Sequence, residues 1–401
     1  MSDLSLSTFE NLIGSNNVDS AADPPVLLPP NEKLLSEIVR KAVSDNLKIR
    51  VKGRDAFPAP GFQHDGIVVS TTALSSIIEV NPEDFIVITQ AGVSAGDVVR
   101  EAEQKGFLMP LDIIYGSEAT AGGAFMAGTF GLSAYRYKDF SDSVIGIKCV
   151  TADGEIVIGG GRTAKNVTGY DITRFFAGTM GLFAIAYELT IKLSSVPESR
   201  LVITAGFPPG SELKKAVTNI VACAVKATLL EVVFPDGPDG GTTIGAGIDG
   251  LETIVDSSID TVRNILNAAG AKEIHVEKLD AYIIRRREAA KNIFGPGFYT
   301  ISVPPFSSGV FFEKIHELSR TMPVLTHPAE GKFHVICCDE KLAGKLGKTS
   351  LAVGGKHPVG WNRLRKEGIS HLFTAAELEI IRKVKRELDP SNILNPHLLS
   401  G

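Results

Sequence analysis

Two histidines in a predicted hairpin have the clearest potential for chemistry. The run 324–336 has the pattern strand, turn, strand, and a four-residue turn over 329–332 would place His327 directly opposite His334. Opposed Cβ atoms of a hairpin lie about 4.5–5.5 Å apart, so two imidazoles could share one ligand. The competing interpretation is a purely structural pair of strand histidines.

Two glycine-rich blocks form a second candidate site. The block 116–124 lacks the Gly-Lys-Ser/Thr ending of a Walker A loop, and it is not a G-x-G-x-x-G turn that opens a helix after a strand. Its small residues would let backbone N–H groups approach a diphosphate without Cβ interference. The block 159–193 passes through a short helix stopped by Gly178 and a turn containing Gly181 before an alternating apolar strand, 184–193. We interpret it as the floor of a cofactor site, although either block alone could be a tight turn.

The elements that must position these residues follow from periodicity. Asn31 is a plausible N-cap for a helix whose apolar stripe includes Leu35 and Val39. A strand over 48–51 runs directly into Lys52, Gly53 and Arg54. On the residues alone, this segment could be a surface turn with solvated charges.

The glycine-rich blocks carry a family resemblance. The segment 116–157, with ATAGGAFMAG and DSVIGIKCVTADGEIV, resembles the flavin domain of the vanillyl-alcohol-oxidase superfamily. KNVTGYDITRFFAGTMG is similar to the FAD-linked subunits of glycolate and D-lactate dehydrogenases. The resemblance implies an α+β fold: a PCMH-type FAD-binding domain of two subdomains, an α+β substrate-capping domain, and a C-terminal segment returning to the flavin. The expected division is an N-terminal arm, an FAD-binding domain, a cap domain and a completing segment at 1–22, 23–197, 198–335 and 336–401.

The same resemblance implies a set of FAD-binding residues. It implies a diphosphate contact at residues 52–54, which Lys52 and Arg54 would support electrostatically. Neither glycine-rich block contains His or Cys, so we expect FAD to be noncovalent. Asn395 would bond the isoalloxazine edge by resemblance, whereas on sequence alone its Asn-Pro is a turn that stops a helix. The expected contacts are Lys52, Gly53, Arg54, Ser117, Ala119, Thr120, Gly122, Gly123, Lys165, Asn166, Gly169, Tyr170, Asp171, Gly178, Gly181 and Asn395.

A substrate site is implied as well. Arg285, in a run of three arginines on a predicted helix over 279–293, would hold a carboxylate through two parallel hydrogen bonds. A solvated basic face is the alternative. Related dehydrogenases hold a divalent metal with His-x6-His and a later Glu-His, but here Lys356 replaces the acidic ligand before His357. We therefore predict no catalytic metal. The candidate catalytic residues are His357, Arg285, Lys356, His327 and His334.

Composition limits the function classes. The 401 residues carry a net charge of -5, with 44% hydrophobic and 22% charged residues, and no basic face indicates nucleic-acid binding. No stretch approaches the roughly 20 apolar residues of a membrane span. The four cysteines form no C-x-x-C pair and supply no iron–sulfur site.

The expected function follows from the resemblance. It is oxidation of a small 2-hydroxy acid, glycolate or D-lactate. Electrons would pass to an iron–sulfur or electron-transfer flavoprotein partner, beside a sister FAD subunit. The expected location is cytoplasmic, or peripheral to the inner face of the membrane through a partner. The alternative is a non-catalytic flavin electron-transfer or scaffold subunit.

Overall fold

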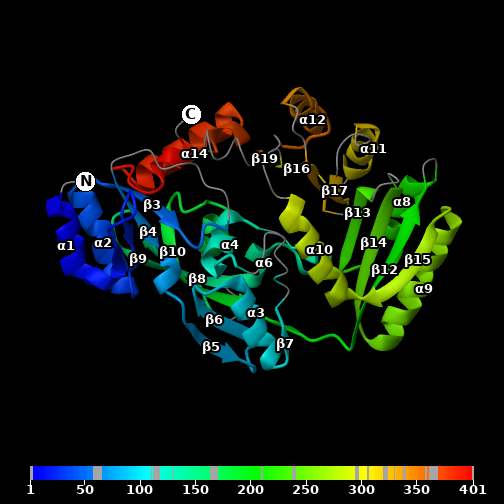
Figure 1. Ribbon diagram of the computed structural model, residues 1–401, viewed down its shortest axis with the longest axis horizontal. Coiled ribbons are helices and arrows are strands. Elements are labelled where there is room, and N and C mark those ends of the chain that lie inside the picture. The colour runs from blue at the N-terminus through cyan, green and yellow to red at the C-terminus, as the bar shows by residue number, and fades with distance from the viewer. Residues whose placement is uncertain are drawn as a thin grey trace. The chain divides into compact units, whose positions relative to one another are not determined.

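The computed structural model divides into two compact units (Figure 1). Unit 1 comprises Met1–Gly131, Asp139–Val196 and Arg365–Gly401, and unit 2 comprises Leu132–Lys138 and Pro197–Leu364. The structure describes residues 3–56, 66–109, 111, 118–129, 131–162, 170–208, 211–236, 241–293, 298–304, 307–318, 324–328, 330–336, 340–356, 359–360 and 369–399.

The first layer of unit 1 is a four-stranded sheet. Its order is β1 (Val18–Asp19), β2 (Val26–Leu27), β4 (Gly66–Ser70), β3 (Lys48–Lys52), and β2 and β3 each run parallel to β4. Helix α2 (Glu32–Ser44) packs its predicted apolar stripe into this core, and the Asn31 side chain accepts the N–H of Leu34 as an N-cap. Helix α1 (Asp3–Ile13) buries Phe9 completely, so the N-terminal segment also contributes to the core.

The second layer of unit 1 is a five-stranded antiparallel sheet. Its order is β5 (Ile77–Asn81), β6 (Ile86–Gln90), β10 (Ala184–Lys192), β8 (Val144–Thr151), β9 (Ile156–Gly160). Strand β10 was expected to be half-buried, but Ala186 and Thr190 on its supposedly outer face are buried too. Both faces are covered, because α4 (Ala121–Ala127) packs against β10 and because Ile185 and Tyr187 lie in the core shared with α2. The Asp153-Gly154 turn between β8 and β9 is confirmed, with Gly154 at φ +81°.

Short elements connect and cover these strands. Besides α1 and α2, unit 1 contains the helices α3 (Ala95–Gln104), α4 (Ala121–Ala127), α6 (Phe140–Ser143), α7 (Ile172–Phe176) and α14 (Ala375–Leu388). Strand β7 (Phe107–Leu108) pairs with β11 (Ser194–Ser195). Thr374 and Glu377 form a capping box at the start of α14.

Unit 2 contains an eight-stranded antiparallel sheet. Its order is β15 (Lys272–Lys278), β12 (Ser199–Phe207), β14 (Gly241–Gly250), β13 (Leu229–Asp236), β17 (Val324–His327), β18 (Lys332–Ile336), β16 (Phe298–Ser302), β19 (Val359–Gly360). This sheet contains strands on both sides of the boundary that was expected between residues 335 and 336. In the structure, the chain passes from unit 2 back to unit 1 at Arg365 instead. Its helices are α5 (Ala134–Tyr137), α8 (Leu213–Ala222), α9 (Glu252–Ala268), α10 (Leu279–Ile293), α11 (Ser308–Leu318) and α12 (Glu340–Ala352).

The two faces of this sheet are covered differently. On one face, α9 packs with Ile244, Ala246 and Ile248 of β14 in the apolar core. On the other, Gly245 and Gly247 alternate with them, and a Cβ on Gly245 would lie 2.4 Å from the Tyr282 hydroxyl of α10. Glycine therefore lets α10 lie close to the sheet.

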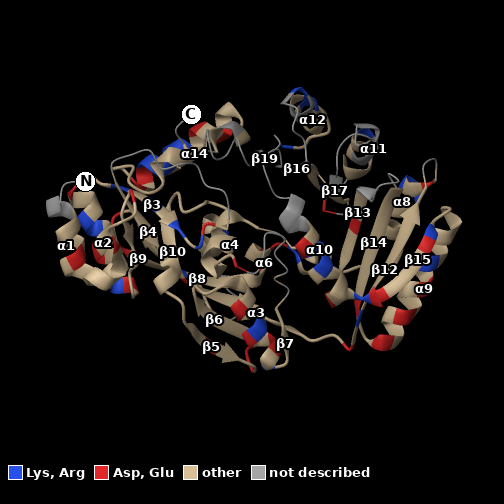
Figure 2. Cartoon of the chain, in the orientation of Figure 1, with Lys and Arg blue, Asp and Glu red and all other residues tan. Residues whose placement is uncertain are grey.

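Charged residues of both signs are distributed over the elements, with acidic side chains gathered along α9 (Figure 2). No helix within the described ranges is long and apolar enough to cross a membrane. Cys149 and Cys223 are free thiols, and Cys337 and Cys338 lie outside the described residues.

Candidate functional site

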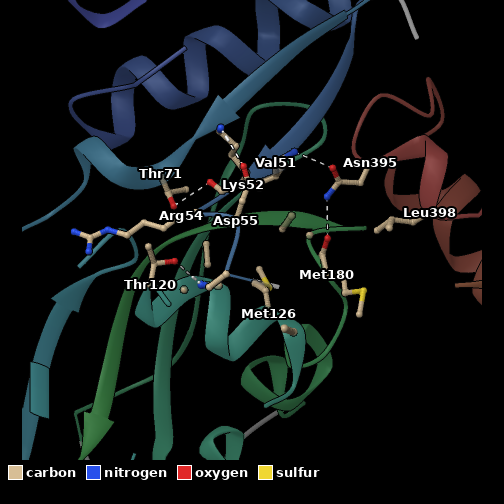
Figure 3. Close-up of a pocket in the computed structure, with 18 of the residues that line it drawn as sticks. Val51, Lys52, Arg54, Asp55, Thr71, Thr120, Met126, Met180, Asn395 and Leu398 are labelled. Carbon is tan, nitrogen blue, oxygen red and sulfur yellow. Dashed lines mark hydrogen bonds and ion pairs between the residues drawn. The ribbon is translucent and has the colours of Figure 1, made fainter. Parts of the chain in front are cut away.

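A pocket in unit 1 brings together chain segments that are far apart in sequence (Figure 3). Its walls come from the end of β3 with the following loop, from α4, from the start of β10 with the preceding turn, and from residues 395–398. The sequence-predicted residues that line it are Lys52, Gly53, Arg54, Thr120, Gly122, Gly123, Gly181 and Asn395.

Asn395 joins two of these walls. Its Oδ1 accepts the N–H of Val51 at 2.8 Å, and its Nδ2 donates to the carbonyl of Met180 at 2.8 Å. The resemblance had implied a direct bond from this side chain to the isoalloxazine. The structure shows both ends of the amide bound to backbone, so Asn395 fixes the distance between β3 and the turn before β10.

Close approach explains two of the glycines. A Cβ on Gly53 would lie 2.3 Å from Oγ1 of Thr120, so the loop after β3 can meet α4 only without a side chain. Gly181 has φ +71°, and a Cβ there would lie 2.8 Å from Nδ2 of Asn395. Because neither position carries a side chain, a narrow gap stays open between them for a flat group such as a flavin. We call this gap, lined by Gly53 and Gly181, the cradle.

The glycines of α4 act differently from the expectation. The N–H of Gly122 donates to Ala91 O at 2.8 Å, and that of Gly123 donates to Oγ1 of Thr120 at 3.0 Å. These donors were expected to face a diphosphate, but within the protein they are already used. A Cβ on Gly122 would lie 2.6 Å from Cβ of Ala91, so the residue is small because of packing.

The charges at the mouth of the pocket are paired. The carboxylate of Asp55 lies 3.0 Å from Nη2 of Arg50 and 3.1 Å from Nζ of Lys52. Nη1 of Arg54 lies 3.4 Å from Oε2 of Glu118. The sequence indicated Lys52 and Arg54 as cations for phosphate and gave no reason to single out Asp55. Because exposed pairs of this kind are worth only about 0–1 kcal/mol, a bound phosphate can replace the carboxylates.

Several expected FAD contacts do not line this pocket. Ala119 is fully buried and accepts the N–H of Ala95; Tyr170 is 97% exposed; Asp171 caps α7 through the N–H of Arg174. Gly178, at φ +71°, donates its N–H to Phe125 O, which closes the turn next to α4. Ser117, Lys165, Asn166 and Gly169 lie outside the described residues.

The pocket also contains residues outside the predicted set of FAD contacts, although Met180 lies in the turn that we interpreted as part of the cofactor floor. Met180 holds φ +53°, and its N–H donates to Met126 O at 2.7 Å, which sets the backbone beneath the cradle. The Asn-Pro motif was the available signal for His397 and Leu398, which follow it directly. The missed lining residues are Val51, Asp55, Ala56, Thr71, Met126, Ala127, Met180, Ala184, Ala186, His397 and Leu398.

Unit 2 has a buried polar cluster on the face covered by α10. Glu231 of β13 is fully buried, and its Oε1 accepts the Tyr282 hydroxyl and lies 2.7 Å from Nε of Arg286. Tyr282 and Arg286 are four residues apart on α10, so they share one face of the helix. Since β13 pairs with β17, the carboxylate and His327 occupy neighbouring strands.

The histidine hairpin has a different register from the predicted one. His327 lies opposite Lys332 and His334 lies opposite Leu325, because the second strand begins at Lys332, directly after Gly331 with φ +66°. A Cβ on Gly331 would lie 2.1 Å from the carbonyl of Val303. The shift is two residues, which keeps both histidines on one face. Their ring centroids are 5.8 Å apart, so the predicted proximity is retained diagonally.

Burial controls the charge of both imidazoles. Desolvation lowers the pKa of His327 to about 4; Glu231 opposes this effect, and Arg286 and Lys332 add to it. Desolvation also lowers the pKa of His334 well below its ordinary value, helped by His327 and Lys332. Both rings are therefore neutral near pH 7.

Arg285 forms its hydrogen bonds outside this cluster, although its guanidinium carbon lies 5.4 Å from the centre of the Tyr282 ring. Its guanidinium forms two hydrogen bonds, of 2.6 and 2.9 Å, with Glu277 of the edge strand β15, and its side chain is 57% exposed. The sequence favoured Arg285 for substrate binding, but Arg286 is the arginine beside the histidine face. One residue on a helix turns the side chain by about 100°, and the four-residue spacing from Tyr282 was the usable signal.

The remaining expected catalytic positions are only partly described. The N–H of Lys356 donates to Ser302 O at 2.9 Å, and the residue is exposed. His357 lies outside the described residues. Among the residues that are described, no group of three His, Cys, Asp or Glu side chains is placed to hold a metal ion.

Comparison with known proteins identifies the class. Residues 24–160 match the model of the FAD binding domain family. The matched domain and the glycine-lined pocket of unit 1 together indicate a protein that binds FAD. The chain is similar to the glycolate oxidase subunit GlcD of Bacillus subtilis, with 25% identity over 92% of this chain and 87% of that protein. It is also similar to the D-lactate dehydrogenase of Archaeoglobus fulgidus, with 25% identity over 92% of this chain and 90% of the relative.

Solved structures share the fold. The 4-ethylphenol oxidase from Gulosibacter chungangensis superposes with a TM-score of 0.77, covering 99% of this chain and 96% of its own, at 14% sequence identity. An alkyldihydroxyacetonephosphate synthase gives a TM-score of 0.69, covering 93% and 76% of the two chains, at 15% identity. The expected α+β, PCMH-type fold is confirmed.

Proposed function

We propose that this protein is an FAD-dependent dehydrogenase subunit that oxidises a small 2-hydroxy acid, glycolate or D-lactate. The observation that carries the proposal is the ion pair of Arg286 with Glu231, which lies on the strand next to that of His327, while the neutral rings of His327 and His334 lie 5.8 Å apart on the same hairpin. A cation for a carboxylate and imidazoles for a hydroxyl are the groups that a 2-hydroxy acid requires. The names of the two curated relatives agree with this substrate class.

Noncovalent FAD in the unit 1 pocket supplies the hydride acceptor. Gly53 and Gly181 give the flavin room, and Lys52 and Arg54 attract its diphosphate once Asp55 and Glu118 are displaced. Asn395 acts by holding the pocket walls together.

The unit 2 side chains bind and orient the acid. The ion pair with Glu231 keeps the guanidinium of Arg286 on this face of the sheet, where it would receive a carboxylate through two hydrogen bonds. His327 and His334, being neutral, accept a hydrogen bond from the substrate hydroxyl. We propose His357 as the base that takes the hydroxyl proton, and Lys356 as a cation that stabilises the alkoxide.

Anaerobic mixing with substrate tests this proposal. The purified full chain, loaded with FAD, should lose its flavin absorbance on addition of glycolate or D-lactate. Arg286→Gln should raise the half-saturating acid concentration about 100-fold, because a charged hydrogen-bonding pair is worth about 1.5–3 kcal/mol. Arg285→Gln is the matched control and should leave that concentration unchanged. Unbleached flavin with both acids would rule out the activity, and an effect of Arg285→Gln larger than that of Arg286→Gln would assign carboxylate binding to Arg285.

A second candidate is a flavin electron-transfer or scaffold subunit without substrate chemistry. Lys356 favours it, because a lysine stands where related dehydrogenases have an acidic metal ligand. In either case we propose that electrons leave to an iron–sulfur or electron-transfer flavoprotein partner, alongside a sister FAD subunit. If the protein is a non-catalytic subunit, the reduced partner protein should bleach the flavin, whereas glycolate and D-lactate should not.

A further inference from the structure

A buried lysine connects three segments of unit 1. Lys385, on α14, has a side chain that is 5% exposed. Its Nζ donates to Leu182 O at 2.7 Å, to Leu394 O at 2.6 Å and to Oδ2 of Asp389 at 2.5 Å. An ammonium group has three donors, and here each donor has one acceptor.

Asp389 extends this connection around the turn that follows α14. Its Oδ1 accepts the N–H of Ile393 at 3.0 Å and its Oδ2 accepts the N–H of Leu394 at 2.9 Å. The carboxylate is 1% exposed, so the turn is wound around a buried ion pair. Removing one partner would leave the other as an unpaired buried charge.

The two ends of this connection lie next to the flavin pocket. Leu394 immediately precedes Asn395, and Leu182 immediately follows Gly181, and both Asn395 and Gly181 line the pocket. By bonding both carbonyls, Lys385 therefore holds Leu394, next to Asn395, close to Leu182, next to Gly181. Asn395 then bridges the same walls through Val51 and Met180.

We propose that Lys385 is a positioning residue for FAD: it fixes Asn395 against Met180 and so maintains the cradle in which the flavin lies. The residue does not line the cradle itself. Its contribution to FAD affinity therefore passes through Asn395. This inference requires only FAD binding and is independent of the substrate proposed above.

FAD titration of the full-chain apoprotein tests the assignment, with quenching of flavin fluorescence as the readout. Lys385→Met should raise the Kd for FAD about tenfold or more, because two carbonyl bonds and the ion pair that hold Asn395 are lost. Lys383→Met, an exposed lysine on the same helix, is the matched control and should leave the Kd unchanged. Native affinity in the Lys385→Met protein would overturn the proposal.

A double-mutant cycle separates positioning from general stability. In an Asn395→Ala background, Lys385→Met should change the Kd by less than about twofold, since coupled residues are not additive. If the effects of Lys385→Met and Asn395→Ala on the free energy of FAD binding simply add, Lys385 does not act through Asn395. If Lys385→Met fails to fold, Lys385→Met combined with Asp389→Asn removes both charges together and takes its place. That variant should fold, because no unpaired buried charge remains, yet bind FAD weakly; native FAD affinity would overturn the assignment.

Discussion

Replacing Gly181 with alanine gives the sharpest test of the flavin cradle. Alanine would have to hold φ near +71°, which costs an L residue about 1–2 kcal/mol. Its Cβ would also lie 2.8 Å from Nδ2 of Asn395, so the amide must leave Met180 O and lose a bond worth about 0.5–1.5 kcal/mol. We expect a total loss of about 2–3 kcal/mol in the stability of unit 1.

Two other glycines of unit 1 separate these contributions. Gly106 has φ +81°, and a Cβ on it would meet nothing within 4 Å, so Gly106→Ala should cost only the backbone strain. Gly161 lacks both a positive φ and near neighbours, so Gly161→Ala should be close to neutral. Denaturant titration of the three variant apoproteins and the native apoprotein measures how much free energy of unfolding each substitution costs.

FAD affinity provides the second readout of the same series. Gly181→Ala should weaken FAD binding about tenfold, because displaced Asn395 no longer joins the pocket walls. Gly106→Ala and Gly161→Ala should bind FAD as the native protein does. If Gly181→Ala and Gly106→Ala lose the same stability and both keep native affinity, the cradle does not lie at Gly181.

Three further predictions concern metal, pH and thiol chemistry. Elemental analysis after identical purification should find no stoichiometric divalent metal in the native protein. The Lys356→Glu protein should gain zinc or manganese, because a carboxylate replaces an ammonium group that repels a dication. Stoichiometric metal in the native protein, removable only with loss of activity, would refute this prediction. Hydrogen bonding to Arg285 lowers the pKa of Glu277, so this pair's stabilisation should be complete above about pH 4.5 and disappear as pH falls through the lowered folded pKa. Arg285→Gln should flatten that acid slope in thermal unfolding, and an unchanged slope would exclude the pair as its source. Burial raises the pKa of the Cys149 thiol to about 12, so iodoacetamide at pH 8 should leave it unmodified until unfolding, and mass spectrometry would reveal any native labelling.

The sequence alone determined the elements whose signals are local. The Asn31 cap and apolar stripe of α2, the Asp153-Gly154 turn and the strand after Gly181 were all predicted correctly. Each depends on side-chain periodicity or on a backbone conformation that one or two residues impose. The two glycine-rich motifs also indicated FAD correctly, through their resemblance to the motifs of FAD-binding proteins.

Tertiary structure decided which atoms each residue actually meets. Asn395 bonds Val51 across a sequence separation of 344, and this long-range contact gives it a role as a bridge between walls. Gly122 looked like a phosphate donor but packs against Ala91, because α4 lies directly on that segment. In unit 2, hairpin register set the histidine geometry and helix rotation brought Arg286 to Glu231 in place of Arg285. Local patterns specify secondary structure and face, whereas the partner of a given side chain depends on how distant segments pack.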